Sequence, residues 1–391
     1  MSDFPDRTSA PDAQPLLRPV RLGALELPNR VVMAPMTRAR AANAELAPTD
    51  LHATYYAQRA GAGLIVSEGT WVSPEAIGYI NVPGIYTDAQ TAGWTKVTEA
   101  VHAAGGRIVS QVGHLGAASH PDHHGGRLPG GPSAINPQEQ SFTPEGLKDT
   151  VTPRALTAAE IATTIDSYRQ AAVNARRAGF DGMEIHAQGS HLLAQFLNPR
   201  LNRRTDAYGG SAERRAQLLL DIVDVVSEVW GSDRVGVKLS PYWNRGPAFT
   251  ADAEVLADYD QLLKRLSDND LAYLQLVGPE PGTGVGTGTD SGTGTDSGAD
   301  AGTDGPLAAF ARFRAHYRGA LVANLGFTRE SGNDLLERRL ADAVAFGVPF
   351  IANPDLVDRF AHGHLLAEGD RETYYAGGVE GYTDYPAVSG S

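Results

Sequence analysis

Short β-branched stretches alternate with longer stretches of helical spacing along almost all of this 391-residue chain, and this alternation constrains the fold more than any other feature. It predicts eight strands, at residues 31–35, 63–68, 107–112, 180–186, 234–240, 272–277, 320–324 and 343–346. Eight strands that are each followed by a helix indicate an α/β fold of the (β/α)8, or TIM barrel, type. A doubly wound open sheet shares the alternation and is the alternative, although no glycine-rich dinucleotide fingerprint follows the first strand.

The helix predicted over residues 158–178 has the clearest boundaries. Its apolar residues recur at three- and four-residue intervals, and Thr157 with Glu160 predicts a capping box at its start. Gly179 predicts its end. A comparable apolar stripe predicts a helix over residues 214–230, and the turn-rich segment 16–27 predicts a small N-terminal β-hairpin before the barrel.

Two segments lack the alternating pattern. Residues 1–15 are polar and proline-rich, so we expect a disordered N-terminal tail followed by a single domain over residues 16–391. Residues 279–306 are almost wholly Gly, Thr, Asp and Ser, and the hexapeptide GTGTDS occurs twice between Gly286 and Ser297. This low-complexity composition predicts a loop insertion, either a mobile lid on the active-site face or a disordered segment that tolerates changes of length.

Composition excludes several classes of protein. The net charge is −13 and no basic stretch stands out, which argues against nucleic-acid binding. There is no cysteine, so disulfides, thiolate metal ligands and thiol nucleophiles are all excluded. No apolar run approaches the roughly 20 residues that span a bilayer, and the N-terminus lacks the features of a signal peptide. We expect a cytoplasmic protein that does not associate with membranes.

Polar residues gather where the predicted strands end, and the C-terminal strand ends of a barrel build its active site. They are Thr37, Ser67, Glu68, Gln111, His114, Glu184, His186, Gln188, His191, Lys238 and Asn324. Such donors and acceptors on a rigid frame predict a site for a polar, planar ligand. We predict no metal site, because His186 and His191 are poorly spaced for zinc and Glu184 is expected on the opposite face of its strand. The histidine-rich segment HPDHH at residues 120–124 lies in a Gly/Pro loop, where solvated histidines are common.

Several longer motifs resemble the Old Yellow Enzyme family over nearly the whole chain, from about residue 16. They are NRVVMAPMTRAR from Asn29, GLIVSEGT from Gly63, TPRALTAAEI from Thr152, NARRAGFDGMEIH from Asn174, QFLNPRLNRRTDAYGGSAERR from Gln195, VAFGVPFIANPDL from Val344 and EGYTDYP from Glu380. The resemblance implies a TIM barrel that holds FMN without a covalent bond. It also implies that NADPH or NADH reduces the flavin, and that hydride passes from flavin N5 to an activated alkene.

The resemblance assigns the strand-end residues to the cofactor. Pro35, Met36 and Thr37 are expected against the isoalloxazine ring, with the Thr37 hydroxyl near its O4. Because that contact tunes the flavin potential, Thr37 counts among the catalytic residues. The other implied contacts are Gly69 and Gln111 at the pyrimidine edge, Lys238 near N1 and O2 in place of an arginine, and Asn324 and Gly347 in two phosphate-binding loops.

The segment HAQGSHLL, from His186, departs from the family pattern. His186 matches the first of two side chains that bind the substrate oxygen, but Gly189 occupies the position of the second. His191 stands where the family has a tyrosine proton donor. An imidazole, with an ordinary pKa of about 6.5, suits proton transfer near neutral pH, and the alternative is that His191 only fills the space of the lost ring.

Two further departures bear on substrate and cofactor. Gly113 stands where the family usually has a bulky residue, which predicts a wider pocket. Val348 stands where the family has an arginine that contacts the FMN phosphate. Losing a charge-assisted hydrogen bond of this kind weakens binding by roughly 1.5–3 kcal/mol.

The sequence therefore predicts an FMN-dependent, NAD(P)H-linked reductase of an activated C=C bond, of the enone type and with a bulky small-molecule substrate. Two alternatives are open. One is flavin-dependent desaturation or redox-neutral isomerisation in specialised metabolism, suggested by the replaced tyrosine. The other is a barrel without FMN that has a non-redox or binding role, suggested by Val348 and Gly189. The oligomeric state is not determined by the sequence.

Overall fold

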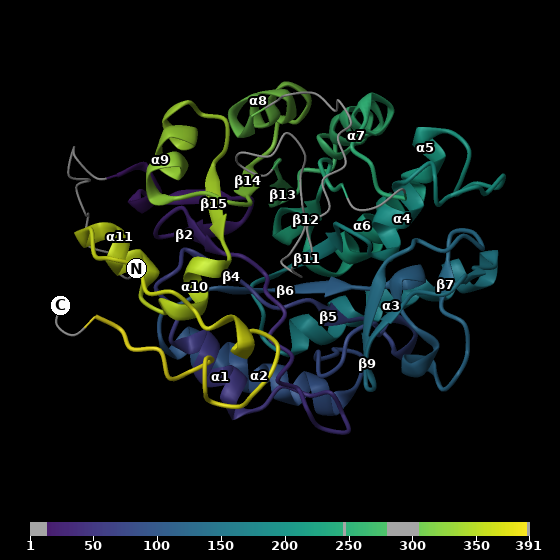
Figure 1. The fold of residues 1–391 in the computed structure, drawn as a ribbon. Helices are drawn as coiled ribbons and strands as arrows, with labels where there is room; N and C mark the ends of the chain where they lie inside the picture. Colours follow the sequence, from purple (N-terminus) through teal and green to yellow (C-terminus); the bar gives the residue numbers. More distant parts are fainter. Residues whose placement is uncertain (1–13, 245–247, 280–304, 389–391) are drawn as a thin grey trace.

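A computed structural model of the chain describes residues 14–244, 248–279 and 305–388 (Figure 1). The predicted N-terminal tail, apart from residues 14 and 15, lies outside the described residues. So does most of the predicted insertion at 279–306, of which the two ends are described.

Eight parallel strands close into a barrel, which confirms the predicted fold class (Figure 1). In chain order they are β3 (Val31–Met33), β4 (Leu64–Val66), β6 (Ile108–Gly113), β11 (Gly182–Ala187), β12 (Val235–Leu239), β13 (Tyr273–Val277), β14 (Leu321–Asn324) and β15 (Ala343–Phe346). Each strand overlaps one of the predicted segments. The pairing of β15 with β3 joins the last barrel strand to the first, and the pairing of β6 with β11 completes the ring, so the open-sheet alternative is excluded.

The barrel strands are separated by helices that surround them (Figure 1). The longer helices are α1 (Asp50–Ala57), α2 (Asp88–Ala103), α3 (Ala158–Arg177), α6 (Gln217–Trp230), α7 (Ala253–Leu266), α8 (Pro306–His316), α9 (Arg329–Glu337) and α11 (Leu356–His362). The shorter ones are α4 (Leu192–Leu197), α5 (Ala212–Arg215) and α10 (Val348–Ala352). The 3-10 turns are η1 (Pro15–Leu17), η2 (Pro74–Ala76), η3 (Gly116–Ala118), η4 (Pro121–His124), η5 (Ser232–Arg234) and η6 (Arg371–Thr373).

The predicted ends of α3 are confirmed. The Thr157 hydroxyl accepts a hydrogen bond from the backbone N–H of Glu160, and the Glu160 carboxylate accepts one from the backbone N–H of Thr157 at 2.8 Å. Gly179 has φ +85°, the left-handed conformation that commonly ends a helix. The helix predicted over 214–230 is instead two helices, α5 and α6, which meet at Ala216.

An N-terminal hairpin lies against the N-terminal ends of β12 and β13. It consists of β1 (Val20–Leu22) and β2 (Leu25–Leu27), as the segment 16–27 predicted. The backbone N–H of Ala24 donates to the Asp233 carbonyl, just before β12, at 2.8 Å. The hairpin leucines are buried against barrel residues such as Val32 and Val322, so the hairpin extends the core of the barrel.

The connection between β6 and α3 contains small sheets that the sequence analysis did not predict. A hairpin of β8 (Gln140–Thr143) and β9 (Gly146–Asp149) lies there, with the short parallel pair β7 (Gly130–Gly131) and β10 (Arg154–Ala155). A further short strand, β5 (Thr70–Trp71), pairs with β6 above the barrel ring. None of the helices in the described part of the chain is long and apolar enough to cross a membrane.

Candidate active site

The C-terminal rim of the barrel carries most of the predicted site residues. Pro35, Met36 and Thr37 lie just beyond the end of β3, separated from Met33 by one residue, and all three are half-buried. Gly69 lies in the turn between β4 and β5 and is also half-buried. A barrel interior is normally filled with side chains, so partly exposed residues at strand ends mark the face that is open to a ligand.

Two stacked imidazoles form the centre of this rim. His186 is near the end of β11, and His191 is the residue before α4. Their ring centroids are 3.7 Å apart and the ring planes differ by 20°. The backbone N–H of Gln188 donates to His186 Nδ1 at 3.3 Å, which leaves the proton of the neutral ring on Nε2. His186 therefore has one fixed hydrogen-bond donor.

Both imidazoles are neutral near pH 7. Burial lowers the pKa of His186 well below its ordinary value, and the positive charge that His191 and Lys238 can carry lowers it further. Burial also lowers the pKa of His191 to about 4, although the Gln188 carbonyl opposes this shift. The lowered pKa argues against His191 as a protonated acid near neutral pH, and its half-buried ring packs against that of His186.

A layer of polar side chains fills the barrel just below the imidazoles. The Gln111 amide donates to Glu184 Oε1 at 2.7 Å. With its amide oriented to satisfy both neighbours, Gln275 donates to Glu184 Oε2 at 3.0 Å and accepts from Lys238 Nζ at 3.1 Å. Parallel pairing places Gln111 beside Glu184 and Gln275 beside Lys238, while Lys238 itself pairs with His186.

This layer corrects the expected position of Glu184. Glu184 and His186 are two residues apart, so their side chains share one face of β11. Gln111 lies close to both Glu184 and Gly69. Its amide binds Glu184, and a Cβ added to Gly69 would lie 3.4 Å from Gln111 Oε1 and 3.8 Å from His186 Cδ2. Gln275 was missed by the sequence analysis, although its place in the strand at 272–277 marked it as a polar residue at this level.

Lys238 and Glu184 form a buried pair of opposite charge linked through Gln275. Burial lowers the pKa of Lys238 to about 8, while Glu184 opposes that shift. Burial raises the pKa of Glu184, while Lys238 and the Gln111 hydrogen bond lower it. Lys238 thus supplies positive charge below the rim at neutral pH and loses it in mildly alkaline solution.

The glycines that replace larger family residues are close to other side chains. A Cβ at Gly113 would lie 3.3 Å from His186 Cβ and 3.4 Å from His191 Cδ2. The space beside Gly113 is thus filled by the imidazole pair, so Gly113 does not by itself widen the pocket. Gly189 has φ +63°, and its Cβ would lie 3.4 Å from the Trp243 indole. Its backbone N–H donates to Ser240 Oγ at 2.8 Å.

The predicted phosphate-binding residues lie on the other side of the rim. A Cβ at Gly347 would be 3.6 Å from Met36 Sδ, so these two residues are neighbours. Asn324 ends β14 and directs its amide to the Ala345 carbonyl at 3.4 Å. Val348 is 62% exposed and apolar, and it offers a phosphate no side-chain hydrogen bond.

The loop after β14 adds a feature that the sequence analysis missed. Leu325 has φ +93° and Gly326 has φ +68°. A leucine in this conformation is strained, and such strain gathers where loops bind ligands.

The remaining histidines highlighted by the sequence have structural partners. His114 Nδ1 accepts the backbone N–H of Gly116 at 3.0 Å, and burial lowers the pKa of His114 to about 3. In the HPDHH segment, His124 Nε2 is 2.9 Å from Ser119 Oγ, and His120 Nδ1 accepts from the backbone of Asp122 at 3.2 Å.

Comparison with known proteins shows the family to which the chain belongs. Residues 15–366 match the family model described as NADH:flavin oxidoreductase / NADH oxidase family. The chain is 37% identical over 390 residues to 12-oxophytodienoate reductase 1 of Oryza sativa subsp. japonica, covering 99% of this chain and 96% of that protein.

Solved structures agree. Morphinone reductase in complex with tetrahydroNAD superimposes with a TM-score of 0.86 at 42% identity, over 96% of this chain and 98% of that one. The Old Yellow Enzyme homologue of Zymomonas mobilis gives a TM-score of 0.85 at 38% identity, over 95% of this chain and 99% of that one. The chain therefore belongs to the NADH:flavin oxidoreductase / NADH oxidase family, the Old Yellow Enzyme family that its motifs resemble, and it is a flavin oxidoreductase.

Proposed function

We propose that the protein uses NADPH or NADH to reduce the C=C bond of an α,β-unsaturated carbonyl compound. The observation that carries the proposal is the stacked pair of neutral imidazoles, His186 and His191, at the rim of a barrel of this family. Relatives named as 12-oxophytodienoate and morphinone reductases support the substrate class. Because the imidazole pair fills the space beside Gly113, the two histidines, more than that glycine, limit substrate size.

The side chains of the rim support a site for an isoalloxazine ring. Gly69 brings backbone without a side chain beside the Gln111 amide, and Lys238 offers a buried cation. Pro35, Met36 and Thr37 present half-buried faces on the β3 side. We propose that these residues hold the ring of FMN, with the loops at Asn324 and Gly347 holding its phosphate. Bound FMN supplies the hydride in this chemistry.

His186 binds the substrate oxygen in this proposal. Its Nε2–H is the one donor left by the contact of Nδ1 with the Gln188 backbone, so it can stabilise negative charge that develops on a carbonyl oxygen. One such donor is commonly worth about 3 kcal/mol of transition-state stabilisation. Gly189 provides no second side-chain donor at this oxygen.

His191 holds the His186 ring in place by stacking. Because its pKa is about 4, it is not a protonated acid at neutral pH. We therefore propose that solvent supplies the proton that completes the reduction. We also propose that residues 16–391 act as one catalytic domain with the 279–306 segment as an insertion, since β3 and β15 from opposite ends of the chain pair in the same barrel.

The test begins with the visible absorption of the purified protein before and after FMN is added. Flavin absorption that survives desalting, bleaching by NADPH, and reoxidation by 2-cyclohexenone are the expected results. A colourless protein that takes up no FMN would overturn the proposal and favour a barrel with a non-redox role.

Two variants then test the residue roles. His186→Ala is expected to lower kcat/KM by about 10²–10³-fold and to weaken binding of a phenol, while His191→Phe keeps the stack and most of the activity. His102→Ala, on the outer surface of α2, is the matched control. Unchanged phenol binding in His186→Ala would contradict its role, and loss of turnover in His191→Phe would make His191 the proton donor.

A second candidate is redox-neutral isomerisation or desaturation of a specialised metabolite. The low pKa of His191 favours it, because a neutral imidazole is a weak acid for completing a reduction. Turnover of a substrate without consumption of NAD(P)H would distinguish it from the first proposal; desaturation would in addition consume an electron acceptor such as O₂, which takes the two electrons from the reduced flavin, whereas isomerisation would consume none.

A further inference from the structure

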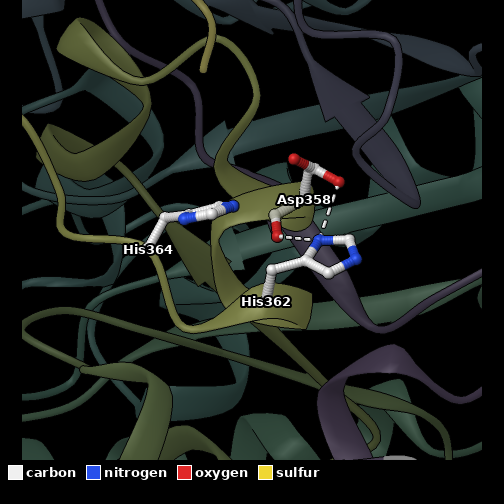
Figure 2. Close-up of side chains that lie close together, drawn as sticks. All are labelled: Asp358, His362 and His364. Atoms are coloured by element: carbon white, nitrogen blue, oxygen red, sulfur yellow. Dashed lines mark hydrogen bonds and ion pairs between the residues drawn. The ribbon is translucent and has the colours of Figure 1, made fainter. Parts of the chain in front are cut away.

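Three potential metal ligands gather on the outer surface of the barrel, on α11 and the residues after it (Figure 2). They are Asp358, His362 and His364. One ligand atom from each lies within 4.8 Å of the other two. Within the described residues no other group of three or more histidine, aspartate or glutamate side chains converges in this way. The cluster plays no part in the proposed reduction, because its residues lie on α11 and beyond it, and not at the strand ends.

Helical spacing brings the first two residues together. Asp358 and His362 are four positions apart on α11, so they share one face of the helix. His362 Nδ1 is 3.1 Å from Asp358 Oδ1 and 3.1 Å from the Asp358 carbonyl oxygen (Figure 2).

A tight turn at the end of α11 brings in the third residue. Gly363 has φ +71°, which reverses the chain, and the backbone N–H of His364 donates to the Arg359 carbonyl at 3.0 Å. This is the Schellman bond that folds a chain back over the last turn of a helix. The buried Arg359 guanidinium also donates to the Leu365 carbonyl at 2.6 Å, so the backbone on both sides of His364 is held.

The side chains themselves stay open to solvent. The His362 side chain is 55% exposed and that of Asp358 is 34% exposed, so a hydrated cation can reach them. Bonds of about 2.0–2.2 Å from zinc to nitrogen and oxygen require neighbouring ligand atoms to be about 3.3 Å apart in a tetrahedron. Rotation of exposed side chains closes the present spacing to that value.

The donor set selects a class of metal. Two imidazoles and one carboxylate suit Zn²⁺, Ni²⁺ or Cu²⁺, whereas Mg²⁺ and Ca²⁺ prefer sites made only of oxygen atoms. We propose that Asp358, His362 and His364 bind one divalent transition-metal ion such as Zn²⁺, with water in the remaining positions. This departs from the sequence analysis, which predicted no metal site and considered only the HPDHH segment and the His186–His191 pair.

Isothermal titration calorimetry of the full chain with ZnCl₂, after removal of any histidine tag, tests the site. The expected result is one Zn²⁺ bound per chain, with at least about tenfold weaker binding in both His362→Ala and His364→Ala. Gly363→Val retains all three ligands but opposes the left-handed turn, so it is also expected to weaken binding.

His102→Ala is the matched control, because His102 Nε2 is 3.0 Å from Asp181 on another exposed surface but lacks a third ligand. It is expected to bind zinc as the wild type does. Three outcomes would overturn the proposal: no zinc bound, unchanged affinity in both His362→Ala and His364→Ala, or equal losses in His102→Ala and the cluster variants.

Discussion

At the scale of single residues, the environment of each rim side chain decides its chemistry. Burial keeps His186 and His191 neutral by lowering the pKa of each imidazole, and the nearby Lys238 cation lowers both further. Lys238 keeps a positive charge because Glu184 lies within reach through Gln275. Burial lowers the pKa of the two imidazoles and of the lysine, which favours their neutral forms. The neighbouring Glu184 opposes this shift for Lys238, whereas the Lys238 cation adds to it for the imidazoles.

Lys238 predicts a pH dependence of flavin reduction. As the pH rises through about 8, the ammonium loses its proton, and the proposed charge-assisted contact with the flavin is lost with it. The rate of flavin reduction by NADPH is then expected to fall about tenfold between pH 7 and pH 10, which corresponds to a lost contact of about 1.5 kcal/mol. Stopped-flow absorbance measures this rate. Lys238→Arg keeps its positive charge over this pH range, so its rate of flavin reduction should not fall. If the rate in Lys238→Arg fell by the same factor, the pH dependence would belong to another group.

Because Val348 offers no hydrogen bond to the FMN phosphate, we expect weak FMN binding that the substitution Val348→Arg strengthens. Val348→Arg places a guanidinium at the start of α10, where a charge-assisted hydrogen bond to phosphate is worth roughly 1.5–3 kcal/mol. The Kd for FMN, measured by fluorescence quenching, is expected to fall at least about tenfold. Val348→Gln, which adds length without charge, should change it much less. Equal affinity in Val348→Arg and wild type would mean that position 348 does not face the phosphate.

At the scale of the elements, the ends of helices and turns are specified by local contacts. The Thr157–Glu160 capping box begins α3, and the Gly179 conformation ends it. The hairpin of β1 and β2 depends instead on a close approach to the barrel, because its turn lies against the backbone before β12 and β13.

Thr157→Ala is expected to lower the free energy of unfolding by about 1 kcal/mol, since it leaves a backbone N–H at the start of α3 without its side-chain partner. Urea denaturation followed by circular dichroism measures the change. Thr163→Ala, at an exposed position inside the same helix, should be neutral or slightly stabilising because alanine favours helix. Similar losses in both variants would argue against the cap.

Gly23→Ala is expected to destabilise the protein by at least about 2 kcal/mol, because alanine is strained at φ +57° and its Cβ would lie 2.2 Å from the Asp233 carbonyl oxygen. Gly105→Ala is a close control. Gly105 has φ +80° but nothing lies within 4 Å of an added Cβ, so only the backbone strain, about 1 kcal/mol, is expected there. The difference between the two urea midpoints isolates the contact of the hairpin with the barrel. Equal midpoints would mean that this contact adds nothing.

At the scale of the whole molecule, the C-terminal segment 373–382 packs against the loop that follows β3 and stabilises it. Arg38 and Arg40 follow Thr37 and donate to carbonyls of that segment, including Gly381 at 2.8 Å and Thr373 at 2.7 Å. Tyr382 is fully buried, and its ring stacks on Tyr55 of α1 with centroids 4.0 Å apart. Residues 373–382 thereby hold the loop that presents Thr37.

Tyr382→Ala is expected to lower the free energy of unfolding by about 3–5 kcal/mol, the usual cost of removing a large buried aromatic side chain. Tyr382→Phe is the matched control. The Tyr382 hydroxyl has no hydrogen-bond partner among the described residues, so its removal should be neutral or stabilising. Thermal or urea unfolding measures both. A large loss in Tyr382→Phe would reveal a hydroxyl contact, and a small loss in Tyr382→Ala would show that the C-terminal segment contributes little.

The sequence by itself determined the alternation of strands and helices, the approximate positions of the eight strands and the family resemblance, whereas the closed strand pairing decided for the barrel over the open sheet. The strands follow from hydrophobic periodicity, and the capping box of α3 from residues three positions apart, so both are local properties that a linear pattern records. The motifs around Pro35 and His186 also predict which strand ends form the site. The sequence patterns did not predict the interruption between helices α5 and α6 at Ala216, nor the small sheets between β6 and α3. These segments are short and carry little periodic signal.

Only the tertiary structure decided how the site residues act on one another. The stacking of His186 on His191 and the layer of Gln111, Glu184, Lys238 and Gln275 join strands that are far apart in the chain. The low pKa of His191 follows from that packing, and so does the loss of the space that Gly113 was expected to leave. Desolvation and close contact depend on three-dimensional neighbours, and a sequence pattern contains no information on which distant side chains share a cavity.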